Sequence, residues 1–144
     1  MIDGLTNSNA IPVLERLMQF TGQRHKLITN NIANLSTPGF RASDVSVMQF
    51  QAQLAKAIDA RRGTSNGGDA ELKLQSTTEV KIEPDGLTLN PSTLNQNVLF
   101  HDGNDRDVER TMQSLVENFM TFRAAAQLLR SRYEALSTAV RERI

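Results

Sequence analysis

Two histidines, and the acidic residues beside one of them, are the side chains of this sequence best suited to chemistry. His101 is followed by Asp102 and Asp105, which together carry the donor atoms of a divalent-cation site, whereas His25 has no second histidine near it. The order from Asp102 to Asp105 lacks the following glutamate that a calcium loop requires. Helix capping explains the same residues more simply, because Asn and Asp favour the position before a first helical turn. We therefore interpret the His101 segment as a helix start and His25 as a partly solvated helix residue.

Other catalytic and cofactor arrangements find little support in the sequence. The chain has no cysteine, which excludes disulfides, thiolate metal sites and a cysteine nucleophile. The glycine-rich stretch 63–69 lacks the Lys-Ser or Lys-Thr pair of a phosphate-binding loop. We predict no catalytic residue, no cofactor site and no metal site, and hence a protein that is not an enzyme.

Charge and hydropathy limit the kinds of molecule that the chain is expected to bind. The chain has 144 residues, which suit one domain, and its 16 basic residues equal its 16 acidic residues. A net charge of zero provides no general attraction to nucleic acid or anionic lipid. No stretch reaches the roughly 18 consecutive apolar residues of a membrane span. The first seven residues lack the basic and apolar regions of a secretory signal, so we predict neither direct membrane insertion nor a cleaved signal peptide.

Two stretches in which apolar residues alternate at spacings of four and three predict the main elements, a pair of long helices. The first begins near Ala10 to Pro12, with Asn9 as a candidate cap, and the second runs from Asp105 to the C-terminus. A mean spacing of 3.5 residues is typical of helices that pack as a coiled coil. The predicted seam contains Leu14, Met18, Ile28 and Ile32 in the first helix and Val108, Met112, Leu115, Phe119, Phe122, Leu129, Tyr133, Leu136 and Val140 in the second.

Shorter elements are predicted between the two long helices. Thr37-Pro38-Gly39 predicts a type II turn that ends the first helix, and a short helix follows from Asp44 to Arg62, capped by Asp44 or Ser46. Residues 63–103 are predicted to be irregular and mobile, with at most a small β-hairpin around the turn at Pro84. The predicted fold is mainly α, with the terminal helices packed as an antiparallel coiled-coil pair in one structural domain. Its parts are 1–62, 63–103 and 104–144.

The unequal lengths of the two long helices predict a surface for assembly. The C-terminal helix would be roughly 55 Å long and the N-terminal helix roughly 38 Å, so one end of the seam stays uncovered. Exposed apolar stripes of this kind mark partner sites, and a head-to-tail contact that does not close builds a helical tube. We expect Phe119, Phe122, Leu129 and Tyr133 to contact the N-terminal helix, and Leu136 and Val140 to reach toward a neighbouring subunit.

The stretch from Asn30 to Phe40 has an order far more specific than a lone Pro-Gly turn. Its defining residues are Asn30, Asn31, Ile32, Ala33, Asn34, Thr37, Pro38, Gly39 and Phe40. This order resembles the N-terminal motif of the flagellar axial proteins, the rod and hook family, with phenylalanine where tyrosine is commoner. Residues 103–110 resemble, in part, the entry to the C-terminal helix of that family. Because the middle segment is short, the chain resembles a proximal rod subunit, of which two types are candidates.

The resemblance implies a structural role and a location. A chain of this family would be exported by the flagellar type III apparatus without a cleaved signal and would assemble into the periplasmic rod of the basal body. Its implied partners are copies of itself, neighbouring rod, membrane-ring and export-gate proteins, and the export apparatus. The alternative is a soluble helical adaptor that binds another protein. The motif and the polar, mobile middle segment are the features that distinguish the rod subunit from it.

Overall fold

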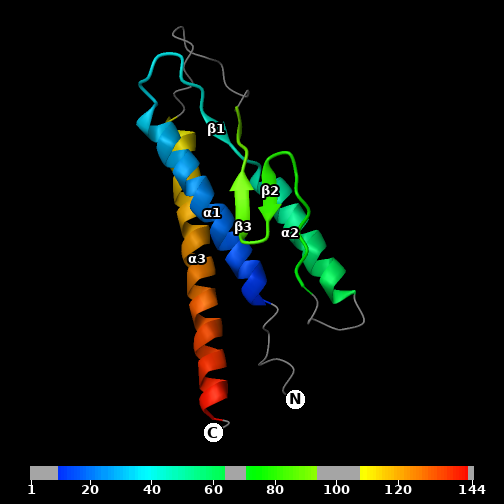
Figure 1. The fold of residues 1–144 in the computed structure, drawn as a ribbon. Coiled ribbons are helices and arrows are strands. Elements are labelled where there is room, and N and C mark those ends of the chain that lie inside the picture. Colours follow the sequence, from blue (N-terminus) through cyan, green and yellow to red (C-terminus); the bar gives the residue numbers. More distant parts are fainter. Residues whose placement is uncertain (1–9, 64–70, 94–107, 143–144) are drawn as a thin grey trace.

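A computed structural model describes residues 10–63, 71–93 and 108–142. Its helices are α1 (Ala10–Ala33), α2 (Val47–Arg62) and α3 (Val108–Arg141), and its strands are β1 (Ser43–Asp44), β2 (Val80–Glu83), β3 (Gly86–Leu89) and β4 (Ser92–Thr93). Figure 1 shows α1 and α3 side by side and running in opposite directions, with α2 and the β2–β3 hairpin on the other side of α1. The predicted mainly α fold with a paired set of terminal helices is therefore confirmed. The proposed cap Asn9 and the His101 segment lie outside the described residues.

The chain leaves α1 through a tight corner. The backbone N–H of Thr37 donates to the carbonyl of Asn34 at 2.9 Å, and the N–H of Phe40 donates to the carbonyl of Thr37 at 3.1 Å. Gly39 follows Pro38 with a φ of +74°, a conformation that favours glycine. Pro-Gly at the centre of a turn closed by this hydrogen bond is the type II turn predicted from the sequence.

Helix α2 begins after a serine cap. The Ser46 hydroxyl accepts a hydrogen bond from the backbone N–H of Gln49 at 3.2 Å, so Ser46, one of the two predicted candidates, is the cap. Asp44, the other candidate, lies in β1 and uses its carboxylate elsewhere. At the far end, the backbone N–H of Gly63 donates to the carbonyl of Asp59 at 3.0 Å.

The middle segment contains the predicted hairpin and one strand of a second pair that the sequence did not reveal. Strands β2 and β3 pair antiparallel, with Lys81 opposite Thr88 and the turn between Glu83 and Gly86. Strand β1, directly after the corner, pairs antiparallel with β4, directly after the hairpin. The hairpin is thereby tied to the chain that follows α1.

Side chains occupy both outer edges of the hairpin. On β2, the hydroxyls of Thr77 and Ser76 accept from the backbone N–H groups of Val80 and Ile82, each at 3.0 Å. On β3, the side-chain amide of Gln23 accepts from the N–H of residue 89 at 3.1 Å and donates to the carbonyl of residue 87. An amide presents the same donor and acceptor pair as a peptide group, so Gln23 occupies the place of a neighbouring strand.

The largest hydrophobic cluster lies between α1, α2 and the hairpin. The rings of Phe20 and Phe50 stack with centroids 3.9 Å apart and planes 2° from parallel. The other buried members of the cluster are Val45, Leu54, Val80 and Leu87, with Val13 and Leu17 of α1 packed against them. Helix α1 thus has a second apolar side, formed by Val13, Leu17 and Phe20, in addition to the side that faces α3.

Helix α3 is the longest element, with 34 residues against 24 in α1. It extends past the first residue of α1 (Figure 1), as the unequal helical patterns predicted. None of the described helices is long and apolar enough to cross a membrane.

Candidate assembly surface and corner

The seam residues predicted on α1 all contribute to packing within the chain. Ile28 is buried, with 1% of its surface exposed. Leu14, Met18 and Ile32 are half-buried. Because α1 is covered on two sides, these side chains offer little free surface to another molecule.

The seam residues predicted on α3 divide into two rows. Leu115, Phe122, Leu129 and Leu136 are half-buried, whereas Val108, Met112, Phe119, Tyr133 and Val140 are 43% to 65% exposed. The two fully buried residues of the helix are Asn118 and Ala125. Asn118 lies one position before the exposed Phe119 of the predicted seam, and Ala125 lies two turns after Asn118 on the same face. The face of α3 toward α1 therefore keeps Leu115 and Phe122 but uses Asn118 in place of Phe119, one residue or roughly 100° around the helix.

Because Asn118 rather than Phe119 is buried, an apolar surface stays exposed on the first half of α3. We call this surface the outer stripe. Its members recur at three- and four-residue spacings, so they share one side of the helix. They are Val108, Met112, Val116, Phe119 and Met120, each at least 43% exposed. Isolated exposed apolar residues are ordinary, but a continuous row of this length marks a contact surface.

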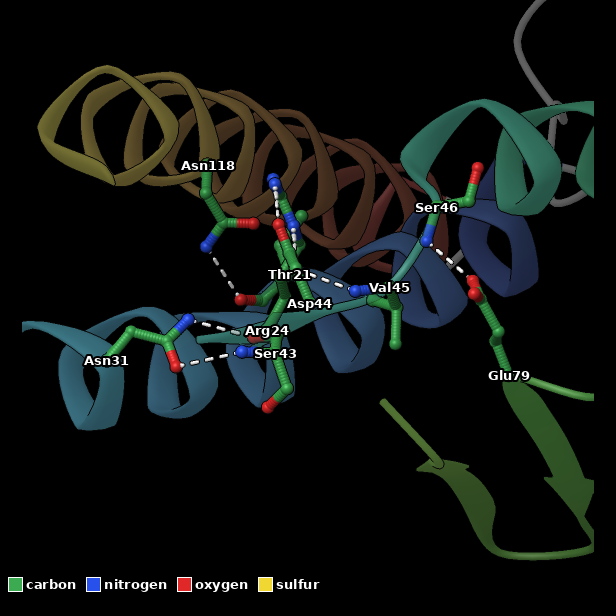
Figure 2. A network of polar contacts seen from close by, with 9 residues as sticks. All are labelled: Thr21, Arg24, Asn31, Ser43, Asp44, Val45, Ser46, Glu79 and Asn118. Atoms are coloured by element: carbon green, nitrogen blue, oxygen red, sulfur yellow. Dashed lines mark hydrogen bonds and ion pairs between the residues drawn. The ribbon is translucent and has the colours of Figure 1, made fainter. Parts of the chain in front are cut away.

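Polar contacts also fix the register of α1 against α3. The Asn118 side-chain amide donates to the backbone carbonyl of Thr21 at 2.8 Å, inside the interface (Figure 2). Farther along, the Tyr133 hydroxyl donates to the Glu15 carboxylate at 3.0 Å. This hydrogen bond, the negative charge of Glu15 and partial desolvation together raise the pKa of Tyr133 above its ordinary value.

A small hollow opens where the outer stripe meets α1. It has a volume of about 170 Å³ and is lined by Gly22, His25, Asn118, Phe119 and Phe122. His25 is exposed at this site, as predicted. The lining is mainly apolar, because it is formed largely by the two phenylalanine rings.

The corner is held by side chains that reach across it from α1. The Asn31 amide donates to the carbonyl of Ser43 at 2.8 Å and accepts from its backbone N–H at 3.2 Å (Figure 2). Two turns earlier on α1, Arg24 binds Asp44 through two bonds, Nε to Oδ1 at 2.9 Å and Nη2 to Oδ2 at 2.6 Å. Planar two-bond pairing of this kind fixes orientation as well as distance. Strand β1 is therefore fastened to α1 at two successive residues.

The same polar network continues to the hairpin. Asp44 also accepts from the backbone N–H of Val45 at 2.8 Å. Glu79 then accepts from the Ser46 backbone N–H at 2.7 Å through one carboxylate oxygen and from the Ser92 hydroxyl at 2.9 Å through the other. The corner, the start of α2 and both strands of the β1–β4 pair thus share one set of contacts.

The residues of the motif differ in what they contact. Asn31 is buried and bonds across the corner, whereas Asn30, Ala33, Thr37, Pro38 and Gly39 are exposed. Ile32, Asn34 and Phe40 are half-buried. Asn34 stays local, donating from its amide to the carbonyl of Asn30 at 2.9 Å.

The structure adds residues that the sequence interpretation missed. Gln23, Arg24 and Asp44 were not predicted to pair with anything, and Asn118 was not part of the predicted seam. A signal for Arg24 was available, because it lies one turn from both Phe20 and Ile28 on a buried side and needs an acidic partner there. In the described part of the chain, no three His, Cys, Asp or Glu side chains converge as a metal site would require.

Comparisons with known proteins agree with the motif at the corner. A family model described as flagella basal body rod protein matches residues 18–41, the second half of α1 and the turn after it. The FlgB rod protein of Yersinia ruckeri is 26% identical over 145 residues, covering 99% of both chains. That of Bacillus subtilis is 26% identical, covering 92% of this chain and 94% of its own, and that of Borrelia hermsii is 25% identical, covering 92% and 96%.

The chain is similar to flagellar basal body rod proteins in the corner motif and over nearly its whole length. The predicted resemblance to the flagellar axial family is therefore confirmed. Among those proteins, the chain is similar over nearly its whole length to the rod protein FlgB, one of the two proximal types considered from the sequence, the other being the FlgC type.

Proposed function

We propose that this chain is a structural subunit of the bacterial flagellar basal-body rod. The similarity to FlgB proteins over nearly the whole chain carries the proposal. Flagellar basal body rod proteins are structural, and the contacts described above join the elements of the subunit to one another.

Assembly would proceed through the terminal helices, with α3 as the main contact element. The side chains of the outer stripe, and that of Val140 near the end of α3, are apolar and at least 43% exposed. Contacts between copies, and with neighbouring rod proteins, would remove this surface from water at about 25 cal/mol for each Å². A repeated head-to-tail contact whose rotation does not close gives a helical tube.

The corner would set the direction of the chain between the helix pair and the outer part of the subunit. Asn31 and Arg24 support this role, because they fasten β1 to α1 directly after the turn. Replacing Pro38-Gly39 with Ala-Ala would remove both the turn geometry and the break in the helix. We expect that variant to be made in the cell but not to build a working rod.

The wider setting follows from the same proposal. The rod part of the basal body would lie in the periplasm, and the chain would reach it through the flagellar type III apparatus without a cleaved signal. Membrane-ring and export-gate proteins would be neighbours at the base of the rod.

A complementation experiment tests the function. In a strain that lacks the chromosomal copy, the unsubstituted chain should restore motility and appear in purified basal bodies. Leu136→Asp, which puts a charge on the seam beyond α1, should reduce both. Ala135→Asp is the matched control, because Ala135 is its exposed neighbour on another side of α3. A chain that stays outside basal bodies and leaves motility unrestored would favour the adaptor instead.

A further inference from the structure

Gly22 lies in the middle of α1, where its own subunit gives no reason for a glycine. Glycine lowers helix stability relative to alanine, so a mid-helix glycine usually has a conformational or packing cause. Among the described residues, the positive φ that favours glycine occurs at Gly39 and not at Gly22. A Cβ placed on Gly22 would meet only a ring carbon of Phe122, at 3.9 Å, which is ordinary van der Waals contact.

The missing side chain instead leaves the hollow between α1 and α3. Its volume of about 170 Å³ has room for one large apolar side chain, and the rings of Phe119 and Phe122 form much of its wall. Asn118, which also lines it, already donates its amide to Thr21. The lining of the hollow is therefore better suited to an apolar group than to a polar ligand.

The hollow is continuous with the outer stripe, because Phe119 belongs to both. A helix lying along the outer stripe would therefore pass the mouth of the hollow. One side chain of that helix would enter beside Gly22 while its neighbours cover Met112 and Val116.

We infer that the hollow receives an apolar side chain from the end of α3 in a second copy of this chain. Helix α3 is ten residues longer than α1, 34 against 24, or about 15 Å. Near the C-terminal end of α3, Leu136 is half-buried and Val140 is 65% exposed. One helix thus has a receiving surface near its start and an exposed apolar side chain near its end. A head-to-tail contact between copies covers both at once and repeats from copy to copy.

This inference rests on the proposed rod function and names the side of the subunit that the neighbouring copy occupies. It makes Gly22 a residue for assembly rather than for folding. Filling the hollow should therefore change folding and assembly in opposite directions.

The first test compares Gly22→Ala and Gly22→Leu with the unsubstituted chain. Thermal unfolding of the purified chain should shift upward for Gly22→Ala, because alanine favours the helix and its Cβ fits. In a strain that lacks the chromosomal copy, the amount in purified basal bodies should fall for Gly22→Ala and fall at least tenfold for Gly22→Leu. Ala60→Leu, on the exposed side of α2, is the control and should be incorporated normally.

The second test identifies the occupant by cross-linking. Because the chain has no cysteine, a variant with His25→Cys and Val140→Cys carries one thiol beside the hollow and one on the end of α3. A short bismaleimide added to purified basal bodies should join copies into dimers and longer ladders, and either single variant should not form ladders. Products that join this chain only to another rod protein would overturn the second-copy assignment.

The two proposals fail in different ways. If the unsubstituted chain is absent from basal bodies, the rod function fails and the inference fails with it. If the unsubstituted chain is present and Gly22→Leu is present in equal amount, the hollow is not an assembly site although the rod function stands.

Discussion

The two long helices of this chain pack side by side but are buried to very different extents. Helix α1 contributes five fully buried residues, which are Phe20, Thr21, Arg24, Ile28 and Asn31. Helix α3, although longer, contributes two, Asn118 and Ala125. The difference arises because α1 has neighbours on two sides, α3 on one and the α2–hairpin layer on the other (Figure 1).

This difference in burial suggests that α1 mainly stabilises the subunit, whereas α3 mainly provides surface for assembly. Side chains of α1 hold the subunit together through a stacked aromatic pair, a buried ion pair and two amides that bond to strands. Side chains of α3 mostly remain available to other molecules. Equivalent substitutions in the two helices should therefore have unequal effects on folding.

The largest difference is expected between two phenylalanines. Phe20→Ala should lower the free energy of unfolding by about 3–5 kcal/mol, because Phe20 is 1% exposed and stacks on Phe50. Phe119→Ala should cost less than about 1 kcal/mol, because Phe119 is 45% exposed. Urea denaturation followed by circular dichroism measures both. Equal losses would show that α3 contributes to the fold as much as α1 does.

A second comparison uses two ion pairs. Asp44→Ala should cost about 3 kcal/mol, because it leaves the Arg24 guanidinium, only 9% exposed, without its partner. Glu134→Ala removes the carboxylate from the exposed pair with Arg130 on α3 and should leave the denaturation midpoint unchanged. Urea denaturation followed by circular dichroism measures both variants. A large loss of stability in Glu134→Ala would contradict the expectation that side chains of α3 contribute little to folding.

A smaller difference in the free energy of unfolding is expected between variants of two buried asparagines. Asn31→Ala should cost about 2 kcal/mol, because both the N–H and the carbonyl of Ser43 lose their partner. Asn118→Ala should cost about 1 kcal/mol, because it removes one bond to the carbonyl of Thr21. Hydrogen exchange at Ser43 should accelerate in the first variant and stay slow in the second.

The smallest effect is expected at Tyr133, the one tyrosine of the chain, and is measured by titrating its hydroxyl. Phenolate absorbance should rise at a pH above the ordinary range, because the hydrogen bond to Glu15, and then its charge, raise the pKa of Tyr133. A raised pKa means that the contact stabilises the fold below the ordinary pKa of tyrosine and is lost as pH rises through the raised value. Glu15→Gln should lower the midpoint, and an unchanged midpoint would show that the contact is not formed in solution.

Local signals in the sequence were sufficient to predict the three helices and the β2–β3 hairpin, but not the pairing of β1 with β4. Apolar periodicity predicted the terminal helices, Pro38-Gly39 predicted the turn, and alternation around Pro84 predicted the hairpin. Each of these features depends on residues a few positions apart, which is where sequence patterns are most informative.

The contacts that organise those elements were not predicted, because they join distant residues. Arg24 and Asp44 are separated by the corner, and Gln23 bonds to a strand 64 residues later. The orientation of α3 was ambiguous for a different reason. A 3.5-residue pattern contains two overlapping rows that share Leu115 and Phe122, and the choice depends on Asn118 and Ala125. A polar and a small side chain carry no weight in a hydrophobic pattern.

The capped edges of the hairpin have a consequence for a protein proposed to polymerise. Many identical copies at high local concentration would place unpaired strand edges close together, and such edges template cross-β fibres. Here Gln23 covers β3, and the hydroxyls of Ser76 and Thr77 cover β2. Helix α1 and the residues just before β2 therefore together prevent the hairpin from recruiting a strand of another copy, which leaves growth to the helical surfaces.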